Sequence, residues 1–147
     1  MLNIGDKAPN FELKNQDGDV IELKKVLSTG KKVMLVIYPA DDTPGCTAQM
    51  CRVNDDYSDF KEIGVEVFGL NHNSAVSHIK FKNKYNFKFD ILIDEGRKTI
   101  IEYGAIKKFF NNEVTQRSVF VIDTDGKIIF AVKGQQNNQE IIDLLKK

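Results

Sequence analysis

Both cysteines of the chain lie in one short segment, from Pro39 to Cys51, which closely follows a run of apolar residues. Thr43 is a plausible helix N-cap, and Pro44 suits the first helical position because its missing N–H costs nothing there. Cys46 would then be the third helical residue, where free backbone N–H groups and the positive end of the helix dipole stabilise an anion. Because the thiolate is the reactive form of cysteine, this spacing predicts a reactive thiol at Cys46.

The second thiol, Cys51, follows Cys46 by five residues. If the segment stays helical, the two Cα atoms lie about 8–9 Å apart, beyond the roughly 7 Å that a disulfide spans. Cys46 falls in line with the apolar positions of the helix and should face inward, whereas Cys51, about 140° around the helix, should face the polar side. A disulfide between them therefore requires the helix start to unwind, which Pro44 and Gly45 favour because they stabilise a helix weakly.

Two acidic residues, Asp41 and Asp42, precede the predicted cap and would disfavour the thiolate if their side chains faced it. Arg117 is the best candidate for an offsetting cation, because it precedes an apolar strand that could lie beside the reactive segment. Its guanidinium stays charged, and the planar fork could bind both the thiolate and a substrate oxygen. Thr43 could add a hydroxyl at the same place, and Pro39 could stiffen the loop and shield the thiolate from water.

The elements that must position these residues alternate between strands and helices. We expect a hairpin within residues 10–23, strands at 33–37, 65–70 and 91–93, helices at 44–62, 74–85 and 97–103, a closing hairpin of 118–122 and 127–132, and a last helix from about 139 to 147. Strands joined through helices should be parallel, and the closing hairpin antiparallel. This order predicts an α/β fold of the thioredoxin-like type, with a mixed central sheet flanked by helices and an N-terminal β-hairpin, in a single domain of residues 1–147.

The composition is typical of a globular protein. Of the 147 residues, 41% are hydrophobic and 29% charged, and the 21 basic residues balance the 21 acidic ones, so no net field favours nucleic acid or an anionic membrane. No apolar run has the length of a signal peptide or the roughly 18 residues that span a bilayer. We therefore expect a cytoplasmic protein, where a cysteine pair is more often catalytic, redox-active or metal-binding than structural.

Three other interpretations of the cysteine pair stay open at this point. Cys46 and Cys51 are followed by His72 and His78, a loose match to a zinc site, although the spacing is wide and we expect both histidines to be solvated surface residues. A non-catalytic redox switch would oxidise without turnover. A disulfide oxidoreductase typically uses Cys-x-x-Cys, in which both sulfurs meet without unwinding.

The reactive segment resembles the active-site pattern of the peroxiredoxins, Pro-x-x-x-Thr-x-x-Cys, with Pro39, Thr43 and Cys46 in register. The chain is most similar to the bacterioferritin comigratory protein or peroxiredoxin Q subfamily, whose members carry Y-P-x-D-x-T-P-G-C-T and a second cysteine five residues on. Residues 5–11 match the opening of these proteins, and residues 117–123 match their arginine-bearing strand. With three separated motifs in the same order, the resemblance extends nearly end to end.

The resemblance implies a thiol-dependent peroxidase that reduces hydrogen peroxide and organic hydroperoxides in antioxidant defence. Cys46 would be the peroxidatic cysteine and Cys51 the resolving one, with Pro39, Thr43 and Arg117 completing the pocket. A sulfenic acid on Cys46 would condense with Cys51 to an intramolecular disulfide, the atypical two-cysteine cycle. Thioredoxin or a similar dithiol would reduce it, and no metal or organic cofactor is implied. We expect a monomer or weak homodimer with no nucleic-acid or membrane partner.

Several features outside the core motif depart from the usual subfamily sequence. Ala40 stands where a lysine is common, and residues 71–73 replace a typical Ser-x-Asp stretch. The chain has no tryptophan, which many relatives carry near Lys107. We interpret residues 107–110 as a strand or loop with one buried phenylalanine, or as a patch that flanks the substrate or mediates self-association. These differences bear on substrate preference and surface contacts.

Overall fold

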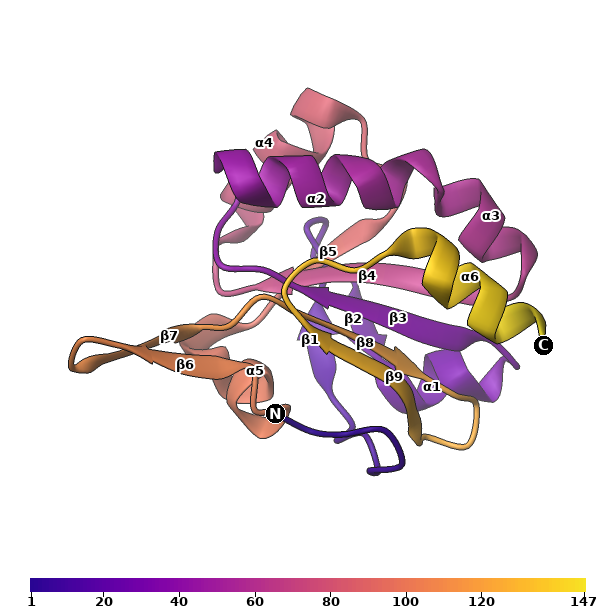
Figure 1. The fold of residues 1–147 in the computed structure, drawn as a ribbon. Helices are drawn as coiled ribbons and strands as arrows, with labels where there is room; N and C mark the ends of the chain where they lie inside the picture. Colours follow the sequence, from indigo (N-terminus) through magenta and orange to yellow (C-terminus); the bar gives the residue numbers. More distant parts are fainter.

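The computed structural model describes residues 1–147, and strands alternate with helices through most of it (Figure 1). In chain order the elements are β1 (Glu12–Lys14), β2 (Val20–Glu22), α1 (Leu23–Ser28), β3 (Lys32–Ile37), α2 (Pro44–Asp55), α3 (Tyr57–Glu62), β4 (Val65–Asn71), α4 (Ala75–Tyr85), β5 (Asp90–Ile93), a 3-10 turn (Glu95–Arg97), α5 (Lys98–Glu102), β6 (Ile106–Phe109), β7 (Asn112–Thr115), β8 (Ser118–Ile122), β9 (Ile128–Lys133) and α6 (Asn138–Lys146).

A five-stranded mixed sheet with the strand order β5-β4-β3-β8-β9 forms the centre of the molecule. β3 pairs in parallel with β4, and β4 in parallel with β5, as expected for strands joined through helices. β8 pairs antiparallel with both β3 and β9. The two hairpins β1-β2 and β6-β7 form separate small sheets. The predicted N-terminal hairpin, parallel pairing and antiparallel closing hairpin are all confirmed.

Helices cover both faces of this sheet (Figure 1), with α2, α3, α4 and α6 on one face and α1 and α5 on the other. The first face buries Met50, Phe60 and Phe81 against the sheet, and the second buries Leu27 and Ile100. Because both faces are covered, β3 and β8 consist almost entirely of buried residues. No helix combines the length and apolar character needed to cross a membrane.

The helix predicted over residues 44–62 is two helices. The backbone leaves the helical conformation at Asp56, where φ is −105° and ψ is 12°. The side chain of Asn138 contacts this break: its Nδ2 donates to Oδ2 of Asp56 and to the carbonyl oxygen of Arg52, both at 2.9 Å. The C-terminal end of α2 is therefore bound to the start of α6, an arrangement that no local sequence pattern indicates.

One element was not predicted from the sequence, and a second was predicted only as a strand or loop over residues 107–110. α1 is a single short helix that buries Leu23 and Leu27, and six residues are too few to show helical periodicity clearly. The second is the hairpin β6-β7, which projects from the body of the protein (Figure 1). The expectation of one buried phenylalanine there is wrong, because Phe109 is 59% and Phe110 86% exposed.

One glycine in the sheet lets α2 approach closely. A Cβ at Gly69 in β4 would lie 2.8 Å from Cε of Met50 and 3.3 Å from Cε1 of Tyr38. A side chain at this position would require Met50 and Tyr38 to shift, so Gly69 lets α2 pack closely on the sheet.

Candidate active site

The register of the sheet brings the reactive segment and Arg117 to the same edge. Ser118, the first residue of β8, pairs with Ile37, the last residue of β3. Arg117 therefore lies level with Tyr38, where the chain leaves β3 and turns toward α2. The carboxyl ends of β4 and β5 reach the same edge, which is the usual location of ligand sites in open α/β sheets.

Cys46 lies in the first turn of α2 and is only 1% exposed, so it faces inward as predicted. Thr43 occupies the N-cap and Pro44 the first helical position. The hydroxyl of Thr43 does not cap a helix N–H but donates to the carbonyl oxygen of Ala40 at 3.3 Å. The first N–H groups of α2 are thus left uncapped by this side chain, at the end of the helix that favours an anion.

Arg117 contacts the thiol directly. Its Nη2 donates to Sγ of Cys46 at 3.2 Å, and its Nη1 donates to Oε1 of Gln49 at 2.6 Å. Gln49 is fully buried and in turn donates through Nε2 to Oε1 of Gln136 at 3.1 Å. No carboxylate forms a salt bridge with Arg117. The charge of the guanidinium is therefore available to stabilise a thiolate on Cys46.

Asp41, the first acidic residue of the loop, is bound to other partners than Cys46. Its carboxylate accepts hydrogen bonds from the Tyr38 hydroxyl at 2.6 Å, Nδ2 of Asn71 at 3.0 Å and the Ser77 hydroxyl at 2.7 Å, and Nδ1 of His78 lies 2.6 Å from it. Burial alone would raise the pKa of Asp41, but the hydrogen bonds from His78 and Tyr38 outweigh it and hold the pKa below its usual value. Asp41 is thus an ionised carboxylate whose charge is matched locally.

Asp42 is exposed and also pairs with α4. It accepts hydrogen bonds from Nζ of Lys84 at 2.9 Å and from the Tyr85 hydroxyl at 3.1 Å, and the bond from Lys84 lowers its pKa. Each of the two aspartates that precede the thiol therefore has a partner on the same helix, His78 for Asp41 and Lys84 for Asp42.

The prediction that His78 is a solvated surface residue is wrong, because its side chain is completely buried. His78 lies on the inner stripe of α4 with Phe81 and Tyr85, at spacings of three and seven residues, and this periodicity could have revealed its burial. Its Nε2 lies 3.0 Å from the carbonyl oxygen of Leu92, so both ring nitrogens are engaged by the protein. Zinc ligation through His78 would require breaking one of these contacts. His72 is half-buried beside Arg97, and burial lowers its pKa.

Cys51 is half-buried, and both cysteines are free thiols in this structure. Burial, with a smaller contribution from Asp55, raises the pKa of the Cys51 thiol. Cys51 is thus less readily ionised than an ordinary cysteine, which leaves Cys46, beside the guanidinium, as the better nucleophile. Five residues of α2 separate the pair, so the two Cα atoms lie about 8–9 Å apart in the wound helix.

Of the predicted site residues, Cys46 and Arg117 are joined by a hydrogen bond, whereas Pro39 and Thr43 lie in the adjoining loop without a side-chain hydrogen bond to Cys46. Sequence reasoning missed Gln49. Its position one turn after Cys46 places it on the same helix face, which is the signal that could have found it.

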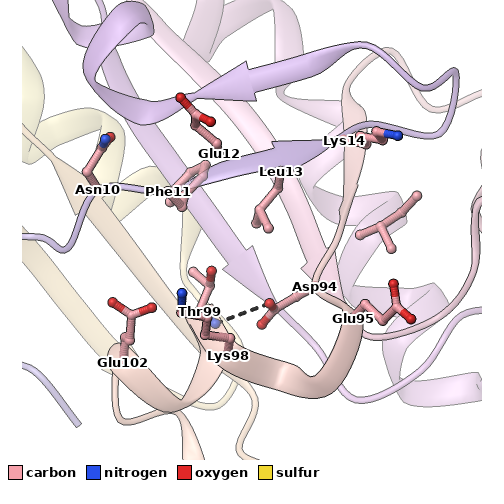
Figure 2. A pocket seen from close by; sticks show the side chains of 11 residues that line it. Asn10, Phe11, Glu12, Leu13, Lys14, Asp94, Glu95, Lys98, Thr99 and Glu102 are labelled. Carbon is pink, nitrogen blue, oxygen red and sulfur yellow. Dashed lines mark hydrogen bonds between the residues drawn. The ribbon is translucent and has the colours of Figure 1, made fainter.

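A cavity of about 570 Å³ lies elsewhere, between the β1 segment and the start of α5 (Figure 2). Polar and charged side chains dominate its walls, and neither cysteine nor Arg117 is among them. Asp94 in this cavity accepts hydrogen bonds from the backbone N–H groups of Thr99 and Ile100, at 3.1 and 2.8 Å, and so caps α5. Burial raises the pKa of Asp94. Asp94 therefore has a structural role at the start of α5, apart from the thiol.

The fold and the site together define a class of protein, a thioredoxin-like α/β domain with a buried thiol at a helix start beside an arginine. The chain matches the model of the AhpC/TSA family over residues 4–131 and belongs to that family. The resemblance to peroxiredoxins of the bacterioferritin comigratory protein and peroxiredoxin Q group is confirmed by sequence relatives. The chloroplastic peroxiredoxin Q of Oryza sativa subsp. japonica is 40% identical over 143 residues, and a putative peroxiredoxin bcp from Coxiella burnetii is 37% identical over 131 residues.

The alignment with the rice relative covers 97% of this chain but only 64% of the length of that protein. The alignment with the Coxiella relative covers 86% of this chain and 85% of that protein. Solved structures agree with the thioredoxin-like fold. Peroxidoxin BcpB from Mycobacterium tuberculosis has a TM-score of 0.89 at 26% identity, with 99% of this chain and 97% of that chain covered. A peroxiredoxin Q variant from Xylella fastidiosa has a TM-score of 0.90 at 25% identity, with 99% and 96% covered.

Proposed function

We propose that this chain is a thiol-dependent peroxidase that reduces hydrogen peroxide and organic hydroperoxides, with Cys46 as the peroxide-reactive thiol. The observation that carries the proposal is the contact of 3.2 Å between Nη2 of Arg117 and Sγ of Cys46 at the start of α2. A guanidinium and a helix start both stabilise a thiolate, and both also offer donors to a second anion next to it. Membership of the AhpC/TSA family supports the same assignment.

In the first step the Cys46 thiolate attacks one peroxide oxygen. The S–O bond forms as the O–O bond breaks, so the sulfur is oxidised to a sulfenic acid and the peroxide is reduced. The leaving oxygen departs as hydroxide or alkoxide and takes up a proton to give water or an alcohol. Arg117 and the N–H groups at the start of α2 stabilise the negative charge that develops on that oxygen, with Thr43 and Pro39 shaping the loop around it.

In the second step Cys51 attacks the sulfenic sulfur. The S–S bond forms, the S–O bond breaks, and hydroxide leaves as water after taking up a proton. The distance of about 8–9 Å between the two Cα atoms in the wound helix requires the first turns of α2 to unwind before this step. A dithiol of the thioredoxin type then reduces the disulfide by thiol–disulfide exchange and regenerates both thiols.

Peroxide turnover with a thioredoxin system tests the proposal in the wild type, Cys46→Ser and Cys51→Ser proteins. We expect Cys46→Ser to abolish peroxide consumption and Cys51→Ser to allow a single turnover. Slow, stoichiometric oxidation of the wild type without turnover would instead indicate a redox switch. Disulfide exchange without peroxide consumption would indicate a disulfide oxidoreductase. Either of these two results overturns the proposal.

We further propose that residues 1–147 act as one domain, as a monomer or weak homodimer in the cytoplasm, with the two cysteines of a single chain completing the cycle. The plant relatives are named as chloroplastic, so fractionation of the source cells is the direct test of location. Intact mass after one equivalent of peroxide tests the pairing: a loss of two hydrogens from a monomeric chain supports it, and a covalent dimer contradicts it.

A further inference from the structure

The fully buried ring of His78 has an acceptor at each nitrogen. Nε2 lies 3.0 Å from the carbonyl oxygen of Leu92, which can only accept, so Nε2 carries a proton. Nδ1 lies 2.6 Å from Oδ2 of Asp41, a carboxylate that also accepts hydrogen bonds from Tyr38 and Ser77. An ionised carboxylate accepts several donors at once, so Nδ1 carries the second proton. The geometry therefore assigns His78 and Asp41 as a buried imidazolium–carboxylate ion pair.

Asp41 ties the loop before Cys46 to α4, to β5 and to the segment after β4. Asp41 belongs to the loop, His78 to α4, and His78 is bound to β5 through Leu92. The backbone N–H of Asp41 also donates to Oδ1 of Asn73, just beyond β4, at 2.8 Å. Removing one partner of a buried pair leaves an uncompensated buried charge, which is a costly change. Asp41 is therefore the point at which the loop is held most firmly.

Beyond Asp41 the loop is held weakly. Asp42 has a left-handed backbone, with φ at 55°, and its pair with Lys84 is exposed to solvent. Exposed ion pairs contribute little to stability. The side chain of Thr43 offers only its 3.3 Å hydrogen bond to Ala40, and the glycine that follows Pro44 stabilises a helix poorly. Firm attachment thus ends, and weak attachment begins, between Asp41 and Asp42.

We propose that His78 is a positioning residue: its ion pair with Asp41 fixes the loop that presents Cys46 to Arg117, and it stays closed as the fixed end from which the start of α2 unwinds. The catalytic part of this inference rests on the proposed peroxidase function. The attack on peroxide needs the wound helix, whereas disulfide formation needs the unwound one. Loss of the pair should therefore slow the first step and spare or accelerate the second. A residue that merely stabilises the fold would affect both steps alike.

Two rate constants in three variants test this proposal. The first is the reaction of Cys46 with hydrogen peroxide in a Cys51→Ser background, and the second is disulfide formation in chains with both cysteines, followed by acid quench and mass spectrometry. We expect His78→Leu to slow the first reaction at least tenfold without slowing the second. His78→Asn, whose amide keeps a donor toward Asp41, should recover part of the loss. The matched control is Lys82→Ala, which breaks a 2.9 Å pair between α4 and Asp90 outside the loop and should leave both rates unchanged.

If His78→Leu does not fold, the Asp41→Asn/His78→Leu double variant replaces it, because it leaves no unpaired buried charge. Unchanged rates in either variant, or an equal slowing of both steps, would overturn the proposal. A wild-type protein that does not consume peroxide would refute the peroxidase function instead. In that case amide hydrogen exchange of residues 42–48 still decides the positioning role: the inference requires faster exchange in His78→Leu than in Lys82→Ala, and equal exchange would contradict it.

Discussion

The substitution Gln49→Leu separates the anchoring of Arg117 from its charge. The 2.6 Å hydrogen bond from Nη1 of Arg117 to Oε1 of Gln49 is charge-assisted, and such bonds contribute about 1.5–3 kcal/mol. Leucine has nearly the same volume, so no large cavity forms, but Oε1 of Gln136 also loses its donor. We expect the free energy of unfolding to fall by about 2.5–6 kcal/mol in all, because a buried acceptor left unpaired costs about 1–3 kcal/mol more.

The effect on peroxide reduction follows from the position of the guanidinium. In Gln49→Leu the charge of Arg117 remains, but one of the two contacts that fix its fork beside Cys46 is lost. Removing a donor to a developing oxyanion costs about 100-fold to 1000-fold in rate. We therefore expect Arg117→Met to slow the reaction of Cys46 by about 100-fold or more, and Gln49→Leu to slow it by about tenfold because the donor is displaced but not removed.

The chain contains no tryptophan, so the rate of Cys46 oxidation is measured by competition with a haem peroxidase for hydrogen peroxide, in a Cys51→Ser background. Stability is measured by urea unfolding with far-ultraviolet circular dichroism. Gln135→Leu is the matched control, because Gln135 is exposed and should change neither quantity. A wild-type rate in Gln49→Leu, together with a slow Arg117→Met, would show that the charge suffices without anchoring and would refute the reasoning.

Three further predictions concern stability. Gly69→Ala should lower the free energy of unfolding by about 1–3 kcal/mol because the new Cβ meets Cε of Met50, and Met50→Val should restore part of it; urea unfolding that shows no loss would contradict the contact. Burial would raise the pKa of Asp90, but the hydrogen bond from Lys82 and others hold this pKa below 3.8. The contribution of ionised Asp90 to the stability of the fold is therefore complete above pH 3.8 and is lost as the pH falls through the lowered pKa. Asp90→Asn should therefore flatten the acid side of a stability–pH curve, and an unchanged acid limb would count against the pairing. Phe110→Asn should raise stability by about 1 kcal/mol, since Phe110 has φ at 57°, a left-handed conformation that asparagine tolerates; calorimetry should show a higher Tm, and a lower one would mean that Phe110 makes stabilising contacts.

The local part of the site could be predicted from the sequence. Thr43 and Pro44 mark a helix start through their own backbone preferences, so the position of Cys46 in the first turn needed no tertiary information. Arg117 required one more step, the placement of its strand beside β3, and antiparallel pairing of Ser118 with Ile37 provides it. These residues are predictable because each depends on a pattern within a few positions or on a simple rule of sheet topology.

The parts that could not be predicted depend on partners far away in the chain. Gln49 bonds to Gln136, 87 residues on, and His78 bonds to Asp41, 37 residues before it. A buried histidine and an exposed one have the same side chain, and only the fold decides which environment it meets. The short helix α1 and the pairing of β6 with β7 were missed for a different reason. Each is too short for its periodicity to stand out, and the exposed Phe109 contradicts the rule that large apolar residues are buried.

The electrostatics of the site follow from how its charges are paired. The two aspartates of the loop carry negative charge close to the thiol in sequence, yet each is matched by a cation of α4. Arg117 is held by the neutral amide of Gln49, and no carboxylate pairs with it. The loop and its partners therefore sum to zero charge, while the guanidinium keeps its full positive charge 3.2 Å from Cys46. A thiolate on Cys46 would neutralise Arg117 without adding a buried carboxylate. The helix α4 thus contributes to the reactivity of Cys46 by pairing with the two carboxylates that would oppose a thiolate.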